Sequence, residues 1–229
     1  MAVETENPQG TTGLRADARR NRERIVAAAQ KLFLEQDIDV PLEEVARRAG
    51  VGIGTLYRRF SDRDALLRAV CEESLRRLAD LAETAWREEP DAWHALCRFL
   101  RASTELRLGT LSAKLDPHLH QQLRAGRDLH EIRQRVIAVV LQMTEQAQAD
   151  GTLRGDIGPG DIALLMTVHV YTPLDVPDEQ AVSRVVEIML SGLRAGSEFT
   201  LPGAPLTGDD LRRYTAVEGS SATRVQLTE

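Results

Sequence analysis

Apolar residues recur every three or four positions along most of the chain, the spacing of amphipathic α-helices. These stripes predict helices over approximately residues 17–36, 42–49, 53–60, 62–88, 93–100, 129–147, 160–171 and 178–195. The alternating pattern of a half-buried strand is absent from the sequence, and no internal repeat is evident. We therefore predict an all-α fold of about nine helices.

Short signals at the ends of the stripes set several boundaries. Pro41 precedes the second stripe, and proline is tolerated in a first helical turn because no N–H partner is needed there. Gly50 follows the same stripe and predicts its end. Ser61 and Asp64 have the S-x-x-D spacing of a capping box, which predicts a new helix from Asp62.

Residues 42–60 form two short helices joined by a glycine-containing turn, the pattern of a helix-turn-helix. The first helix turns small apolar side chains inward, and Val51 fills the turn. Leu56 and Phe60 lie four residues apart, so they share one face of the second helix. We expect this face to pack against the preceding long helix, which carries Phe33.

The remaining positions of the second helix carry groups suited to DNA. Thr55, Tyr57, Arg58 and Arg59 fall on faces open to solvent. Arginine can bond guanine O6 and N7 or a phosphate, and hydroxyl groups can donate to phosphate oxygens. Arg63 falls in the first turn of the next helix, where free N–H groups also favour phosphate.

This segment resembles the N-terminal DNA-binding domain of the TetR family of transcriptional regulators, over about fifty residues without a gap. The resemblance rests on Arg24, Ile25, Ala28, Ala29, Leu32, Phe33, Val45, Ala46, Ala49, Gly50, Val51, Gly54, Thr55, Leu56, Tyr57, Phe60, Arg63, Leu66 and Leu67. It implies a homodimer with a three-helix DNA-binding head and a helical body that binds a small effector. The implied DNA contacts are Thr55, Tyr57, Arg58, Arg59 and Arg63, with Arg48 as a further candidate for phosphate.

The sequence departs from the family pattern at three positions. Asp37 replaces a common glycine, Pro41 a frequent capping threonine and Gly52 a common serine. We therefore assign no capping or phosphate role to Pro41 or Gly52.

Four segments are expected along the chain. Residues 1–13 form a disordered N-terminal arm, and residues 14–65 form the helix-turn-helix domain. Residues 66–196 form the effector-binding and dimerisation domain, and residues 197–229, rich in Pro, Gly, Ser and Thr, form a mostly disordered tail.

Charge is distributed unevenly between these segments. The chain has a net charge of −6, yet residues 15–68 hold twelve Lys/Arg against nine Asp/Glu. A basic portion on an acidic body is expected where one end meets a polyanion such as double-stranded DNA.

Composition excludes several classes of protein. Aromatic residues make up 4% of the chain, so the core must be mostly aliphatic. The chain has no run of eighteen apolar residues, so we expect no membrane partner, and the polar N-terminus indicates a cytoplasmic location. Cys71 and Cys97 show neither a disulfide framework nor a zinc-binding spacing.

Two other patterns have weaker alternative interpretations. The Gly-Val-Gly-Ile-Gly run at 50–54 lacks the preceding strand and third glycine of a phosphate-binding loop. His118 and His120 lie near Asp116, but side chains two apart on a helix point in different directions. We expect no metal, no cofactor and no catalytic residue.

Two sets of body residues are candidates for function or for ordinary core. Trp93, Phe99, Leu100, Leu115, His118, Met143 and Met166 are candidates to line an effector pocket. The last two helices carry apolar stripes that indicate either internal core or a subunit interface, and the resemblance favours the interface. Its candidates are Ile162, Leu165, Val182, Val186, Met189 and Leu193.

The sequence thus predicts a ligand-responsive repressor that binds a pseudo-palindromic operator as a homodimer. An activator, an effector-independent DNA-binding protein and an enzyme in the helical body are the alternatives.

Overall fold

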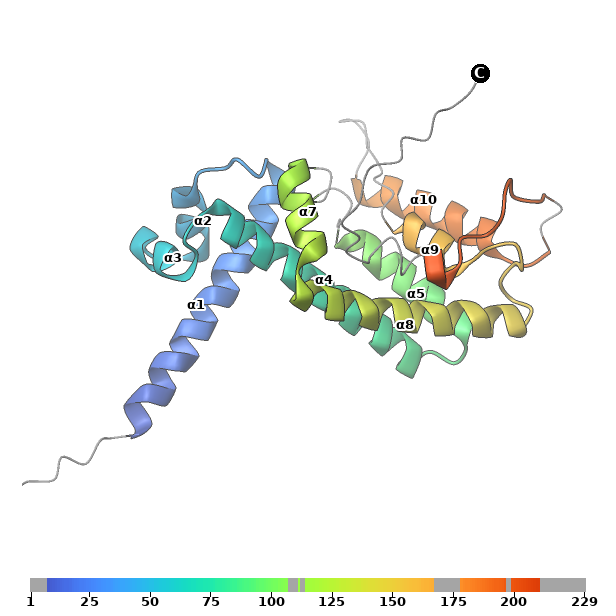
Figure 1. Ribbon diagram of the computed structural model, residues 1–229, viewed down its shortest axis with the longest axis horizontal. Helices are drawn as coiled ribbons and strands as arrows, with labels where there is room; N and C mark the ends of the chain where they lie inside the picture. Colours follow the sequence, from blue (N-terminus) through green and yellow to red (C-terminus); the bar gives the residue numbers. More distant parts are fainter. Residues whose placement is uncertain (1–7, 107–110, 112–113, 167–177, 197–198, 211–229) are drawn as a thin grey trace, which may run out of the picture.

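The computed structural model describes residues 8–106, 111, 114–166, 178–196 and 199–210 (Figure 1). Within these ranges the regular structure is helical, apart from one isolated antiparallel bridge between Leu153 and Arg194. The all-α prediction is confirmed.

Nine helices are delimited in the described ranges. They are α1 (Pro8–Glu35), α2 (Leu42–Ala49), α3 (Ile53–Arg59), α4 (Arg63–Glu88), α5 (Ala92–Glu105), α7 (Pro117–Ala125), α8 (Arg127–Ala149), α9 (Pro159–Leu165) and α10 (Asp178–Leu193). Helices α1 to α3 lie at one end of the molecule, and α4 leads from them into the body formed by α5, α8, α9 and α10 (Figure 1).

The structure corrects the prediction for two helix starts. Helix α1 begins at Pro8, so residues 8–13 are helical and not disordered, whereas residues 1–7 lie outside the described residues. Helix α7 was not predicted. Its start is stabilised by Asp116, whose Oδ1 accepts from the backbone N–H groups of His118 and Leu119 at 2.9 and 3.0 Å.

The Ser61–Asp64 capping box does not form. Helix α4 begins one residue later than predicted, with Asp62 as its N-cap, and Asp62 Oδ1 accepts from the Ala65 N–H at 2.7 Å. The Ser61 hydroxyl donates to the Asp62 carboxylate at 2.8 Å instead. The Asp62 side chain therefore caps the N-terminus of α4, the role that was expected of Ser61.

Two apolar clusters make up the core. The body cluster joins the second half of α4 with α5, α8, α9 and α10. The head cluster joins α1, α2, α3 and the first half of α4, and it also contains Leu111, Leu119, Leu123 and Leu129. Residues predicted to belong to the body thus complete the packing around the helix-turn-helix.

The region after α10 is ordered over residues 199–206, which we call the C-terminal strap. Gly160 N donates to Leu206 O at 2.9 Å, and Leu206 N donates to the Asp161 carboxylate at 3.1 Å. A Cβ atom at Gly158 would lie 2.0 Å from Leu206 O, so glycine allows the strap to approach. The predicted disorder is wrong for residues 199–210, and residues 197–198 and 211–229 lie outside the described residues.

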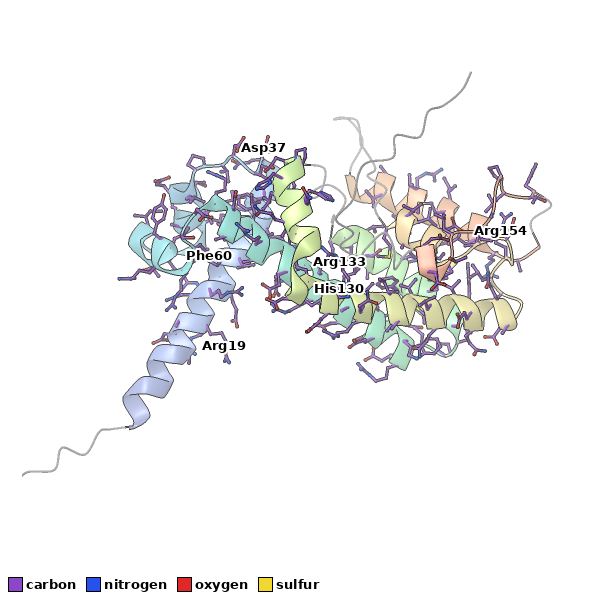
Figure 2. All side chains as sticks on the ribbon, viewed as in Figure 1. Arg19, Asp37, Phe60, His130, Arg133 and Arg154 are labelled. Atoms are coloured by element: carbon purple, nitrogen blue, oxygen red, sulfur yellow. The ribbon has the colours of Figure 1, made fainter. Side chains whose placement is uncertain are left out.

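Arg154, labelled in Figure 2, and Asp156 bind the backbone at the other end of the strap, at Phe199 and Leu201. Arg154 bonds Asp156 through two nitrogens, at 2.5 and 2.8 Å, and donates to Phe199 O at 2.5 Å. The Leu201 N–H donates to Asp156 Oδ2 at 3.1 Å. The hydrogen bond from Arg154 and then that from Leu201 hold the pKa of the Asp156 carboxyl well below its usual range.

Candidate DNA-binding interface

The turn between α2 and α3 has the geometry that the sequence predicts. Gly50 adopts the left-handed conformation, with φ of 64°, which costs glycine little because it has no Cβ. The backbone N–H groups of Gly50 and Val51 then bond the carbonyls of Arg47 and Ala46, at 3.1 and 3.0 Å. Neither Pro41 nor Gly52 provides a side-chain cap for the helix that it precedes.

Helix α3 is too short to be stable alone and is held by its apolar face. Leu56 and Phe60 are buried in the head cluster that contains Phe33, which confirms the predicted anchor. The opposite face is thereby fixed toward solvent.

This solvent-facing side of α3 carries the predicted polar set. Arg58 and Arg59 are exposed, Tyr57 is 48% exposed, and Thr55 is half-buried. Arg58 Nη2 donates to Thr55 Oγ1 at 2.9 Å, which steadies one guanidinium. Because a guanidinium has five N–H donors, Arg58 keeps donors for a base or phosphate.

The end of α2 adds further charged groups. The exposed Arg48 lies 3.3 Å from the Glu35 carboxylate, so its charge is partly offset. Arg47 bonds both oxygens of Glu44, at 2.5 and 2.8 Å, and this hydrogen bonding lowers the pKa of Glu44. Arg48 is therefore a secondary candidate beside the α3 residues.

Arg63 differs from its predicted role as a DNA contact. Its half-buried guanidinium donates through Nη1 to the carbonyls of Val40, at 2.8 Å, and Ile38. The Asp62 carboxylate also occupies the N-terminus of α4, where phosphate was expected. Arg63 therefore holds the loop between α1 and α2 and is not included among the proposed DNA contacts.

Two arginines of α1 contact the recognition helix α3 or the turn before it, and the sequence did not predict this role for them. Arg24 Nη2 donates to Gly50 O at 2.9 Å. The Arg22 guanidinium lies 6.0 Å from the centroid of the Phe60 ring. These contacts connect α1 to the turn and to the end of α3. No signal in the sequence beyond the resemblance at Arg24 indicated them.

Lys114 connects the body to the head. Its Nζ donates to Phe33 O at 2.9 Å and to Gln36 O at 3.0 Å, at the C-terminal end of α1. The neighbouring Leu115 packs against the head cluster and is therefore not a body-pocket residue.

Two of the other candidates for the effector pocket, Leu100 and Met166, line the same small hollow. Trp93, Phe99 and Met143 are buried in the body core, and His118 is exposed with Nε2 2.7 Å from Gln122 Nε2, so these four do not line that hollow. The described residues form a small hollow of about 230 Å³, part of it open solvent. It is lined by Leu100, Ser103, Thr104, Leu165, Met166, Val186, Met189 and Leu190.

The predicted interface residues are divided between core and surface. Ile162, Val186 and Leu193 are buried in the protomer's own core, so they are not open to a second copy, which corrects the prediction. Leu165, Val182 and Met189 are half-buried. The same two helices instead expose Leu164 and Ile188, at 47% and 66%.

The described residues offer neither of two other kinds of site, a metal site and a membrane-spanning helix. His, Cys, Asp and Glu side chains in this part of the chain form no group of three that could hold a metal ion. None of the described helices is both long and apolar enough to cross a membrane.

Comparison with known proteins agrees with this geometry. Residues 25–70 match the family model for bacterial regulatory proteins of the tetR family, and residues 91–195 match that for the transcriptional regulator SbtR-like C-terminal domain. A TetR regulator structure from Mycobacterium vanbaalenii is 33% identical with a TM-score of 0.57. The match covers 80% of this chain and 99% of that one.

Two further relatives give the same result. A TetR regulator structure from Streptomyces coelicolor is 30% identical, with 77% and 99% of the chains covered and a TM-score of 0.56. An HTH-type transcriptional regulator of Staphylococcus aureus (strain USA300) is 32% identical over 93 residues, or 40% of this chain. The matched region spans about half the length (48%) of that curated relative.

Proposed function

The chain belongs to the TetR family of bacterial transcriptional regulators, and we propose that it is a repressor that leaves its operator when a small molecule binds its body. The observation that carries the DNA-binding part is the orientation of α3. Its apolar side is buried in the head, and its outward side presents a phenol and two guanidinium groups.

Each group on α3 has a distinct role in the proposal. Arg58, steadied by Thr55, contacts a base edge in the major groove, and Arg59 contacts a base edge or a phosphate. The Tyr57 hydroxyl donates to a phosphate oxygen, and Arg48 adds a secondary phosphate contact.

The proposed functional unit is a homodimer with its two α3 helices one DNA turn apart, about 34–36 Å. The apolar side chains that α9 and α10 expose, Leu164 and Ile188, support a second copy packing on these helices. A twofold axis between the copies requires a pseudo-palindromic operator.

The effector is proposed to be a small, predominantly apolar molecule that enlarges the hollow among α5, α9 and α10. The lining supports this because Ser103 and Thr104 already bond backbone carbonyls, at 2.9 and 2.7 Å. Motion in the body can reach the head through Lys114 and the leucines of the shared cluster. By linkage, the operator must weaken effector binding by the same factor.

We propose a cytoplasmic location because that is where a bacterial regulator meets its DNA. The proposal includes no enzymatic activity and no cofactor.

The test begins with duplexes enriched by the full chain from a random-sequence pool. Fluorescence anisotropy should give affinity that falls steeply with salt, and Arg58→Ala or Arg59→Ala should each cost about 1–3 kcal/mol if it reads a base. Arg87→Ala, at the far end of α4, is the control and should bind like the parent chain. If no sequence is enriched, or if binding is independent of salt, the proposal is contradicted.

A promoter carrying an enriched sequence tests the direction of control. Transcription should fall when the chain is present, and a rise would identify an activator instead. The effector is sought by adding small apolar compounds to the DNA complex. If every compound that binds the body leaves DNA affinity unchanged, the ligand-responsive part fails.

A further inference from the structure

Residues 16–24 of α1, which precede the head core, are rich in arginine and contain no buried side chain. Among the residues of α1 whose burial the structure describes, burial begins at Ile25, and none of residues 16–24 is buried. Figure 1 shows this part of α1 projecting past α3, away from the body. Because most helical stability in proteins comes from packing an apolar face, an exposed extension gains little from this protomer alone.

This extension, residues 16–24 of α1, contacts the helix-turn-helix directly. Arg24 bonds the Gly50 carbonyl in the turn before α3, and Arg22 lies over Phe60 at the end of α3. Arg22 also lies 3.7 Å from Glu72 of α4. The direction in which α1 leaves the head is therefore fixed relative to α3.

The extension is positive on a protein that is negative as a whole. Residues 16–24 hold four arginines and two acidic residues, whereas the chain has a net charge of −6. Arg19 and Arg20 are the two that do not brace the head, and their side chains are 76% and 61% exposed. Figure 2 shows Arg19 on the projecting part of α1.

Their acidic neighbours hold these arginines only weakly. Arg19 Nε lies 3.6 Å from Glu23 Oε1, and Arg20 pairs with Asp17. Exposed ion pairs of this kind contribute about 0–1 kcal/mol, so a phosphate can replace the carboxylate at little cost.

We propose that Arg19 and Arg20 form a second DNA contact, which binds the phosphates flanking the half-site read by α3. Arg19 precedes Ile25 by six residues, about 9 Å along the helix, and the major groove is about 12 Å wide. That spacing suits the backbone strand at the edge of the groove. This inference rests on the proposed function, because it requires α3 to bind DNA.

The proposal is tested with Arg19→Gln/Arg20→Gln in the full chain, since glutamine has nearly the helix propensity of arginine without its charge. The variant lacks both arginines in each protomer, so the proposed homodimer should lose four phosphate contacts, and the slope of log K against log salt should become shallower by about 3.6. Between 50 and 200 mM salt, the parent chain should then lose about 150-fold more affinity than the variant. The change should be similar on enriched and scrambled duplexes, because phosphates carry no direct sequence information.

The matched control is Arg77→Gln/Arg87→Gln, which removes two exposed, glutamate-paired arginines from α4. Its slope should equal that of the parent chain. Trimming the duplex next to the half-sites should abolish the difference between the parent and the Arg19/Arg20 variant. Asp17→Asn/Glu23→Gln should strengthen binding several-fold at 50 mM salt, since it removes the competing carboxylates.

The outcomes separate this inference from the function on which it rests. If the parent chain shows no salt-dependent DNA binding, the proposed function fails. If the parent binds DNA but the Arg19/Arg20 variant keeps its slope, or changes no more than the control, only the second contact is refuted. Circular dichroism of every variant verifies that helix content is unchanged.

Discussion

Replacing Lys114 by methionine would remove the charged link between body and head while keeping most of its aliphatic stem. The last carbonyls of a helix have no partner within the helix, and Lys114 bonds that of Phe33 at 2.9 Å and the carbonyl of Gln36, the residue after α1, at 3.0 Å. A cation near a helix C-terminus is also favoured by the helix dipole. Loss of the ammonium group therefore affects the end of α1.

The expected cost follows from these two bonds. A hydrogen bond to a charged group contributes about 1.5–3 kcal/mol when it is well shielded. Lys114 is half-buried, so water can replace part of each bond, and we expect about 2 kcal/mol for the pair. For a chain of this size, that corresponds to a fall of about 4–8 °C in the midpoint of thermal unfolding.

Thermal unfolding followed by circular dichroism measures this cost, and the chain provides its own control. Lys31 is the only other lysine, and its Nζ lies 3.8 Å from Glu35 in an exposed pair. Lys31→Met should therefore change stability by less than about 1 kcal/mol. If the two variants unfold at the same temperature, the reasoning about the end of α1 is wrong.

Three further outcomes are expected. Leu56→Ala should destabilise the head by about 2–5 kcal/mol and abolish DNA binding, whereas Ile53→Ala, on the exposed side, should unfold like the parent. Gly158→Ala should displace the strap and speed its proteolysis, whereas Gly155→Ala, whose Cβ meets nothing within 4 Å, should not; equal cleavage would contradict this. The lowered pKa of Asp156 implies a stabilising contribution that is present above the unfolded value, about 3.9, and lost as pH falls through the folded value. Hydrogen exchange of the strap amides, corrected for intrinsic rates, should therefore rise in acid for the parent. Asp156→Asn should lack that acid-dependent rise, and identical pH profiles would refute the assignment.

Local patterns were sufficient to predict the head. The four-residue spacing of Leu56 and Phe60 defines a buried face whatever that face packs against. Gly50 likewise marks a turn whose positive φ depends only on its own missing side chain. Both features depend on residues that are close in sequence, so the buried face and the turn can be predicted from the sequence alone.

Long-range partners could not be predicted in this way. Arg63 has the type and position of a phosphate ligand, but it bonds carbonyls more than twenty residues away. The strap has the composition of a disordered tail, yet side chains around residue 160 bind its backbone.

Stripes in the body are ambiguous for another reason. Periodicity identifies the apolar face of a helix, but it does not identify what covers that face. Val186 and Leu193 belong to a stripe that packs within the protomer, and Ile188 lies on a different face of the same helix. The stripe therefore predicted α10 correctly, but it included residues such as Val186 and Leu193 that are buried within the protomer.

The leucines that complete the head cluster limit how this protein can be recombined with its relatives. A chimaera that joins residues 1–65 to the body of another family member would lack Leu111, Leu119, Leu123 and Leu129. It would therefore lose part of the apolar cluster that packs around the recognition helix α3. A foreign body would have to supply apolar side chains of matching shape at the same places. Exchanges of sensing modules should therefore carry residues 111–129 with the head, and the crossover should fall beyond them.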